Sequence, residues 1–259
     1  MNKLSISIVT YNNEDTIYDA LFSIYTSDMA AQVIVVDNNS SDNTVAIIKD
    51  NFPQINLVCL KKNTGFGAAH NQAIKLIHSD YHIVMNPDIR FEKNVLSNVI
   101  YYMDKYRDIV LMSPKVLNVD STIQHLPKRK PLFKYIISGL LEKKSNNFYK
   151  LRSEYTLRER DITNILDIEF CTGCFMIMRT MIFKECQGFD ERFFLYFEDT
   201  DLTYRFSIYG RTVYNPYIQV YHYWNRDNHK KLKASLIMIH SYVKLKAKWF
   251  LKTERRITS

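Results

Sequence analysis

Residues 33–44 read VIVVDNNSSDNT, and the architecture of the chain can be predicted outward from this stretch. Its four consecutive apolar residues are typical of a strand that is buried on both faces of a parallel sheet. The strand stops at Asp37, and residues 40–42 supply an N-cap for a helix that extends to about Asn51. The stretch therefore predicts a strand–loop–helix unit with a polar loop at the carboxyl end of the strand.

Similar units occur on both sides of this stretch. Apolar runs predict strands at 6–10, 55–60 and 81–85, and apolar residues at helical spacing predict helices at 15–24 and 68–77. Repeated strand, loop and helix units indicate an α/β fold with a parallel sheet and right-handed crossovers. In such sheets ligands bind beyond the carboxyl ends of the strands, so the polar residues there are the candidates for function.

The composition fits one large α/β domain, or one domain with appendages, within 259 residues. Apolar residues make up 46% and charged residues 24%, which excludes wholesale disorder. The formal charge of +8 suggests an anionic partner such as nucleotide phosphates, nucleic acid or a membrane face. Residues 1–9 predict a strand rather than a signal peptide, and the four cysteines are predicted to be reduced thiols.

Two segments depart from the alternating pattern. Residues 127–161 begin with a basic run and continue with an apolar one, which indicates an insertion. It could be a lid or a surface for an amphipathic acceptor, or a solvated helical excursion. Residues 228–256 predict a basic helix with apolar residues at near-helical spacing. Such a helix can lie on an anionic membrane or pack on its own domain.

Two loops carry candidate ligand contacts. Asp37 could accept hydrogen bonds from a base or a ribose, or it could simply turn the chain. Residues 63–71, NTGFGAAHN, join a strand to a helix and contain Gly65 and Gly67. Glycines permit close approach of a ligand, and a helix N-terminus offers free N–H groups to an anion. His70 occupies the third glycine position of a dinucleotide motif, and no P-loop lysine follows, so a phosphate- or sugar-facing loop fits best.

Two further positions are candidate metal ligands. The strand at 81–85 ends in Asn86-Pro87-Asp88, and Mg²⁺ or Mn²⁺ is often held by one or two carboxylates plus substrate phosphate oxygens. The alternative is a proline turn with a polar cap. His222 follows a later strand-like run and could be a further ligand or an ordinary core residue.

Residues 194–205 read FLYFEDTDLTYR and place three carboxylates in an aromatic setting. If Glu198 begins a helix, acidic residues in its first turn suit the helix dipole. Asp201 and Arg205 then stand at i,i+4, where an ion pair forms naturally. Asp199 is left without an obvious structural partner, and the apolar residues before it would raise its pKa. A carboxylate of that kind beside a ligand pocket is a candidate general base.

Taken together, these motifs resemble family 2 glycosyltransferases of the GT-A fold, particularly the bacterial rhamnosyltransferase-like branch. The resemblance covers most of residues 4–225. It rests on IVTYN (8–12), VDNNSSDNT (36–44), NTGFGAAHN (63–71), MNPD (85–88), GCFMIMR (173–179) and GFDERFFLYFEDTDL (188–202).

The resemblance implies a nucleotide-binding, Rossmann-like, mostly parallel sheet flanked by helices, with a C-terminal acceptor-side portion. It implies a GT-A domain at 1–225 and a basic helical tail at 226–259. Within that domain we expect a nucleotide-sugar-binding half at 1–118, an insertion on the acceptor side at 119–165 and a catalytic half at 166–225.

The resemblance also assigns roles to residues. Nucleotide-sugar binding is implied for Thr10, Tyr11, Asn12, Asp37, Asn63, Gly65, Phe66, Gly67, Asn71, Asn86 and Asp88. Asn86-Pro87-Asp88 stands where the family carries its DxD motif; because Asn86 replaces the first aspartate, Mg²⁺ or Mn²⁺ binding falls mainly on Asp88. His222 resembles the third metal ligand of related enzymes, and Asp199 matches the catalytic base.

The implied reaction is an inverting transfer from a nucleotide-sugar donor, with dTDP-L-rhamnose as the leading donor. The implied acceptor is a growing, lipid-linked cell-surface polysaccharide, met by a peripheral enzyme at the cytoplasmic face of the plasma membrane. A UDP-linked donor and a catalytically inactive sugar-nucleotide-binding homologue are the alternatives.

Two other classes fit the sequence less well. A nucleotidyltransferase should carry a basic, glycine-rich loop after its first strand, and residues 10–14 are not one. A nucleic-acid-binding module would explain the charge, but the basic residues concentrate at 128–160 and 230–256, away from the strand ends, and no motif for RNA or DNA is found.

Overall fold

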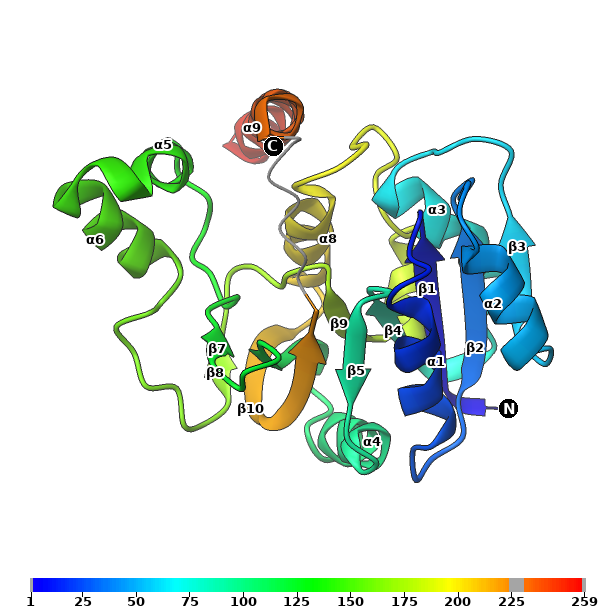
Figure 1. Cartoon of the computed structure of the whole chain (residues 1–259). Coiled ribbons are helices and arrows are strands. Elements are labelled where there is room, and N and C mark those ends of the chain that lie inside the picture. Colours follow the sequence, from blue (N-terminus) through cyan, green and yellow to red (C-terminus); the bar gives the residue numbers. More distant parts are fainter. Residues whose placement is uncertain (1, 224–230, 258–259) are drawn as a thin grey trace.

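The computed structural model describes residues 2–223 and 231–257, and Figure 1 shows a central sheet flanked by helices. The first half alternates as predicted: β1 (Asn2–Thr10), α1 (Ile17–Tyr25), β2 (Gln32–Asp37), α2 (Thr44–Asn51), β3 (Asn56–Cys59), α3 (Phe66–Ala73), the short 3-10 helix η1 (Ile74–Leu76) and β4 (Ser79–Met85). The sequence-based prediction of an α/β fold is therefore confirmed.

The second half is less regular. It contains β5 (Ile89–Phe91), α4 (Val95–Lys105), β6 (Ile109–Leu117), β7 (Ile123–Gln124), α5 (Phe133–Leu141), η2 (Glu142–Lys144), α6 (Asn146–Tyr155), β8 (Leu166–Asp167), β9 (Phe175–Arg179), α7 (Thr180–Glu185), α8 (Glu198–Phe206), β10 (Arg211–His222) and α9 (Lys231–Ile257).

The order of the main strands is β3-β2-β1-β4-β9-β6-β10-β5. The first four are parallel, as are β6 and β10, whereas β9 is antiparallel to both β4 and β6. The sequence pattern did not predict this reversed central strand. Because β9 runs backwards, the turn that precedes it lies at the same edge as the carboxyl ends of the parallel strands.

Alternation along the strands divides the core into two layers. Leu4, Ile6 and Ile8 of β1 belong to a cluster with α1, α2 and α4, whereas Val9 belongs to a cluster with α3, α7 and α8. Successive side chains of a strand point to opposite faces, so these helices cover the sheet on both sides. Burial on both faces explains the continuous apolar runs that predicted the strands.

The predicted insertion and tail pack together at one end of the molecule. Figure 1 shows α5 and α6 standing away from the sheet, with α9 beyond α8. Ile136 of α5 shares a buried cluster with Phe193, Phe197, and Tyr242 and Leu245 of α9. One face of the tail helix thus packs on its own domain. Positions 226–230 and 258–259 of the predicted tail lie outside the described residues.

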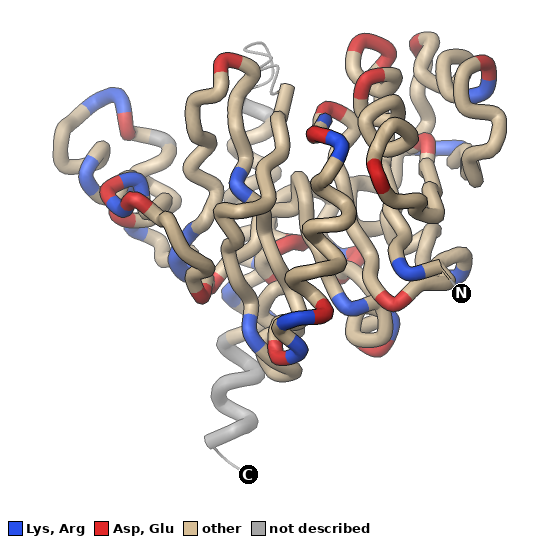
Figure 2. Tube along the Cα trace, turned by 90° about the horizontal axis from the view of Figure 1, so that it is seen from below, with Lys and Arg blue, Asp and Glu red and all other residues tan. Residues whose placement is uncertain are grey.

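Charge and hydropathy add two observations. Figure 2 shows basic and acidic residues interspersed along the trace, including the region of α5 and α6. Across residues 2–223 and 231–257, no helix combines the length and apolar content needed to cross a bilayer.

Candidate active site

The ends of β1 and β2 form the first wall of the site. The Thr10 hydroxyl donates to Asp37 Oδ1 at 3.1 Å, and Asp37 Oδ2 accepts from the Ser40 backbone N–H at 3.1 Å. Asn12, in a left-handed conformation, accepts from the Ser41 N–H at 2.8 Å and so ties the two loops together. The Tyr11 side chain is half exposed and stays accessible to a ligand.

Asn38 joins β2 to the glycine loop, a role that the sequence did not indicate. Its side-chain oxygen accepts from the Thr64 N–H at 2.9 Å, and its amide donates to Asn63 Oδ1 at 3.0 Å. That Asn63 oxygen also accepts from the Gly65 N–H. These bonds fix the loop beyond β3, where a nucleotide-facing loop was predicted.

The two glycines of this loop have different structural roles. Gly65 has φ +90°, and a Cβ there would lie 2.3 Å from the Phe194 carbonyl oxygen. Gly67 lies within the first turn of α3, which begins earlier than predicted, and a Cβ there would lie 2.7 Å from Phe189. Both glycines thus permit residues 189–194 to approach the loop closely.

Two other predicted contacts of the loop are engaged within the protein. The Phe66 ring packs on those of His70 and Phe189. The Asn71 amide donates to the Phe189 carbonyl and to Glu191, both at 2.9 Å, and accepts from the Phe189 N–H. Asn71 therefore holds the segment that leads to α8.

The turn before β9 connects the two candidate carboxylates. The Cys174 carbonyl accepts from the Asn86 N–H at 2.9 Å, and the Gly173 N–H donates to Asp199 Oδ2 at 3.0 Å. Burial raises the pKa of the Cys174 thiol to about 12, and the charges of Asp88 and Asp199 add to this effect. The turn of Gly173 and Cys174 therefore contacts both the end of β4, at Asn86, and Asp199.

Asp199 lies in the first turn of α8, as predicted. Tyr196 and Phe197, just before the helix, both have left-handed backbone conformations, and such strain is typical of functional sites. Asp199 Oδ1 accepts from the Thr200 N–H at 2.7 Å. Burial raises the pKa of the Asp199 carboxyl, while the charge of Lys128 and the backbone donors oppose the rise.

The neighbouring carboxylates differ from Asp199. The predicted ion pair of Asp201 and Arg205 is confirmed, with Arg205 Nε 2.9 Å from Asp201 Oδ2. Glu198 lies in the first turn of α8, as predicted, but it is only 5% exposed and is therefore more than a solvated first-turn charge. Burial, followed by the charge of Asp199, raises the pKa of Glu198 well above its usual range.

Asp88 and His222 lie side by side because β10 pairs with β5. His222 Nε2 lies 3.2 Å from Asp88 Oδ1, a buried oxygen that has no hydrogen-bond partner among the described residues. His222 Nδ1 faces Gln124 Oε1 at 3.0 Å, and the Gln124 amide nitrogen donates to the Asn118 oxygen and the His222 carbonyl.

This network fixes which ring nitrogen of His222 faces Asp88. Gln124 Oε1 accepts a hydrogen bond, so Nδ1 must donate it, and Nε2 is the nitrogen that faces the Asp88 carboxylate. A proton or a metal ion can lie between Nε2 and that carboxylate. One nitrogen and one oxygen ligand, completed by phosphate oxygens, fit Mn²⁺ or Mg²⁺. Within the described residues no cluster of three or more protein ligands is present, so such an ion would rely on its substrate.

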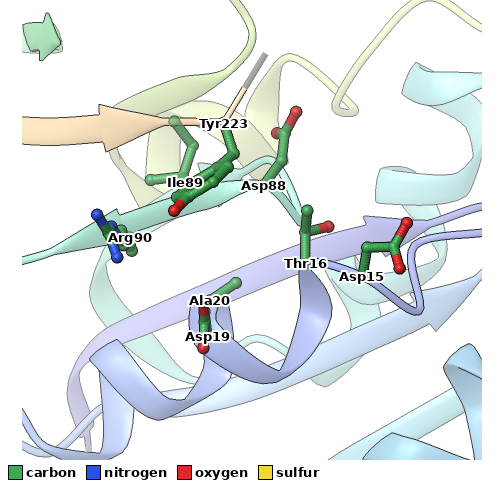
Figure 3. A pocket seen from close by; sticks show the side chains of 8 residues that line it. All are labelled: Asp15, Thr16, Asp19, Ala20, Asp88, Ile89, Arg90 and Tyr223. Atoms are coloured by element: carbon green, nitrogen blue, oxygen red, sulfur yellow. The ribbon is translucent and has the colours of Figure 1, made fainter. Parts of the chain in front are cut away.

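A cavity of about 160 Å³ lies beside Asp88. Figure 3 shows its lining side chains, from Arg90 past Tyr223 and Asp88 to Thr16 and Asp15. The Arg90 guanidinium lies 5.0 Å from the centre of the Tyr223 ring. The sequence did not indicate Arg90, Thr16 or Asp15 as residues of the site. The only signal for any of them was that Asp15 closely follows residues 10–12, for which nucleotide-sugar binding was predicted.

Solved structures of similar shape establish the fold as GT-A. Staphylococcus aureus TarS in complex with UDP-GlcNAc has a TM-score of 0.62 at 21% identity, covering 88% of this chain and 60% of that one. The mannosyltransferase PcManGT of Pyrobaculum calidifontis, in complex with GDP-Man and Mn²⁺, has a TM-score of 0.61 at 14% identity, covering 90% of this chain and 60% of that one.

Sequence comparison gives the family. The N-acetylglucosaminyl-diphospho-decaprenol L-rhamnosyltransferase of Mycobacterium tuberculosis is 24% identical over 236 residues, covering 85% of this chain and 76% of that protein. Rhamnosyltransferase WbbL of Escherichia coli K12 is 27% identical over 238 residues, covering 86% and 84%. The model of "Glycosyl transferase family 2" matches residues 5–187, and the chain therefore belongs to glycosyl transferase family 2.

Proposed function

We propose that this protein transfers a sugar from a nucleotide diphosphate donor to an acceptor hydroxyl, with inversion at the anomeric carbon. The observation that carries the proposal is that the turn of Gly173 and Cys174 contacts Asp199 on one side and Asn86 on the other, two residues before the Asp88–His222 pair. The Asp88–His222 pair can then hold the diphosphate through a metal ion, while Asp199 accepts a proton.

The donor pocket is proposed to lie over the ends of β1, β2 and β4. Thr10, Tyr11, Asn12 and Asp37 surround the nucleoside, and the loop from Asn63 to Gly67 closes over the nucleotide, next to Asn86. The hydrogen bonds that tie these loops together support this arrangement, because a pocket that is already ordered loses less entropy when it binds a ligand. Asn71 acts in the pocket indirectly, through the segment it holds.

Asp88 and His222 are the residues that would hold Mg²⁺ or Mn²⁺. Such an ion neutralises charge that develops on the leaving diphosphate. Asp199 accepts the proton of the acceptor hydroxyl as that oxygen attacks the anomeric carbon from the face opposite the diphosphate. Its raised pKa brings it closer to neutral pH, where a general base works best.

Both relatives are named rhamnosyltransferases, which supports dTDP-L-rhamnose as the proposed donor. The name of the Mycobacterium tuberculosis relative includes a diphospho-decaprenol acceptor, which supports a lipid-linked glycan as the proposed acceptor. The similarity to TarS with UDP-GlcNAc favours a UDP-linked sugar as the alternative donor. No nucleic-acid partner is proposed.

We also propose that the enzyme meets this acceptor at the cytoplasmic face of the plasma membrane, and exposed apolar residues of α9 support contact with a membrane. Beside the residues of α9 that pack on the domain, Leu236, Ile239 and Val243 are 63%, 46% and 60% exposed. We expect Leu236→Ser with Val243→Ser to reduce sedimentation with anionic phosphatidylglycerol vesicles. Met181→Ser is the matched control, because Met181 is 81% exposed on a different helix. Equal sedimentation of both variants would contradict membrane contact through α9.

Donor identity can be tested by a thermal-shift screen of nucleotide sugars with Mn²⁺. A selective rise in melting temperature with dTDP-L-rhamnose is expected, and a response to UDP sugars alone would identify the alternative donor. Asp88→Ala should weaken the metal-dependent part of nucleotide binding, measured by calorimetry. Unchanged affinity in the presence of metal would count against Asp88 as a ligand.

The proton acceptor is tested by Asp199→Asn. Removing a general base should lower the transfer rate by about 10²- to 10⁴-fold, while nucleotide affinity stays close to that of the wild type. If affinity falls as far as the rate does, the assignment is wrong. A wild-type protein that binds the donor without transferring the sugar would indicate an inactive homologue.

A further inference from the structure

Two carboxyl groups stand side by side at the start of α8, and their surroundings differ. Asp199 accepts hydrogen bonds from the N–H groups of Gly173 and Thr200. Glu198 Oε2 is buried and has no hydrogen-bond partner within residues 2–223 and 231–257. Two adjacent carboxyls that are withdrawn from water do not ionise together, so their surroundings decide which one carries the charge.

Lys128 is the cation that acts on Asp199 and not on Glu198. Its backbone forms a bridge with Phe170, and its ammonium lies 4.7 Å from the centre of the Phe170 ring. The Thr172 hydroxyl donates to the carbonyl two residues before Lys128 at 3.1 Å, so the two segments run side by side. Gly173, which donates to Asp199, follows directly. The positive charge is thereby held beside the turn that contacts Asp199.

The other titratable groups that face Asp199 do not compete with Lys128. Burial raises the pKa of the Cys174 thiol to about 12 and raises that of Cys171 well above its usual range. Burial also raises the pKa of Tyr155 of α6. These three groups are therefore neutral near pH 7. Burial lowers the pKa of Lys128 to about 8, and the attraction to Asp199 opposes this change.

Arg152 of α6 faces Lys128 rather than the carboxyl pair. Its positive charge lowers the pKa of Lys128. Its side chain is already directed to Glu142, with Nε 3.9 Å from Oε2. Lys128 is thus the group that supplies positive charge to Asp199.

We propose that Lys128 is a positioning residue that selects Asp199, rather than Glu198, as the ionised carboxylate of the pair. The proposal rests on the role of Asp199 as general base. The proton stays on Glu198, which has its own backbone N–H as a donor where Asp199 has those of Gly173 and Thr200, and which lacks the attraction of the lysine. Asp199 is then a carboxylate, able to accept a proton, at the pH at which the enzyme works.

The test is the pH dependence of kcat/KM for sugar transfer. In Lys128→Met the acidic limb of the pH profile, where kcat/KM falls as the pH is lowered, should shift to higher pH by about one unit. The reason is that a nearby opposite charge normally lowers a carboxyl pKa by at least that much. Lys128→Arg keeps the charge and should retain the wild-type limb. Glu198→Gln removes the competing carboxyl and should move the limb to lower pH. A merely structural role for Lys128 would lower the rate without moving the limb.

Lys128→Gln serves as a second neutral variant if Lys128→Met does not fold. The proposal is overturned if the neutral variants keep the wild-type limb, or if Lys128→Arg shifts as far as they do. Asp199→Asn is measured alongside. Substantial transfer by that variant would refute the general base itself, and this inference with it. If Asp199→Asn is inactive and the acidic limb of Lys128→Met stays where it is in the wild type, only the role of Lys128 is refuted.

Discussion

Asp201→Asn tests how α8 is anchored, because Asp201 is fully buried between two helices. Its carboxylate accepts from Arg205 Nε at 2.9 Å on the same helix. From α9, Trp249 Nε1 donates to it at 3.0 Å, and Lys248 Nζ forms an ion pair with it. Lys248 also pairs with Asp190 at 2.6 Å. The substitution keeps the shape of the side chain and removes the charge that these donors share.

The expected loss of stability follows from these partners. Breaking a buried ion pair costs about 3–5 kcal/mol. Here both cations keep other acceptors: Lys248 retains Asp190, and Arg205 retains the carbonyls of Cys186 and Gly188, both at 2.7 Å. The asparagine oxygen can also still accept one hydrogen bond. We therefore expect a loss of about 2–3 kcal/mol, which corresponds to a fall in melting temperature of roughly 5–10 °C.

Urea denaturation near neutral pH measures this loss, followed by circular dichroism and by tryptophan emission. A Trp224→Phe background leaves Trp249 as the reporter on α9. Asp199→Asn is the matched control on the same helix. Its two oxygens each accept from one backbone N–H, so the asparagine keeps one acceptor and loses the other, and a loss of only about 1 kcal/mol is expected. Equal losses in the two variants, or no loss in Asp201→Asn, would refute this account of the anchoring.

Two further predictions concern the glycine loop and the core beneath it. Gly65→Ala should cost about 1–3 kcal/mol of stability and weaken nucleotide binding in calorimetry, because its Cβ would collide with the Phe194 carbonyl. Gly139→Ala, within α5, is the control that should do neither, because its Cβ would meet only the movable end of the Arg152 side chain, at 3.2 Å. Burial lowers the pKa of His82 to about 3 and that of His70 well below its usual range, so only the unfolded chain takes up these protons as the pH falls below 6.5. The free energy of unfolding should therefore decline in that range by about 1.4 kcal/mol per pH unit for each histidine. Urea titrations of His82→Gln should show a correspondingly shallower decline with falling pH. An unchanged slope would contradict the claim that His82 stays neutral in the folded protein.

Local patterns in the sequence were sufficient for the first half of the fold and for α8. The strands at 6–10, 33–36 and 81–85 were predicted because residues buried on both faces form continuous apolar runs. The pair of Asp201 and Arg205 was predicted because four residues span one helical turn. The second half of the fold, which mixes parallel and antiparallel strands, was not predicted, because its strands pair out of sequence order.

Several features of the site depend on segments that are far apart in the chain. Gln124 orients His222, Asn38 holds the glycine loop, and Lys128 lies beside the turn that contacts Asp199. Gln124 and Lys128 belong to none of the motifs quoted above, and the motif that contains Asn38 does not indicate its contact with the glycine loop. The outcome for the tail was also open, since a basic amphipathic helix can bind a membrane or its own domain; α9 packs on its own domain through Tyr242 and Leu245.

The sequence by itself determined the alternating strands and helices, the polar strand ends at Asp37 and Asp88, and the different positions of Asp199 and Asp201 on α8. These features follow from contacts within a few residues, which side-chain periodicity encodes. Only the tertiary structure decided which strand ends become neighbours. The antiparallel β9 and the pairing of β10 with β5 bring Asp88, His222 and Asp199 to one edge. Strand order is set by packing of the whole sheet, and no local pattern specifies it.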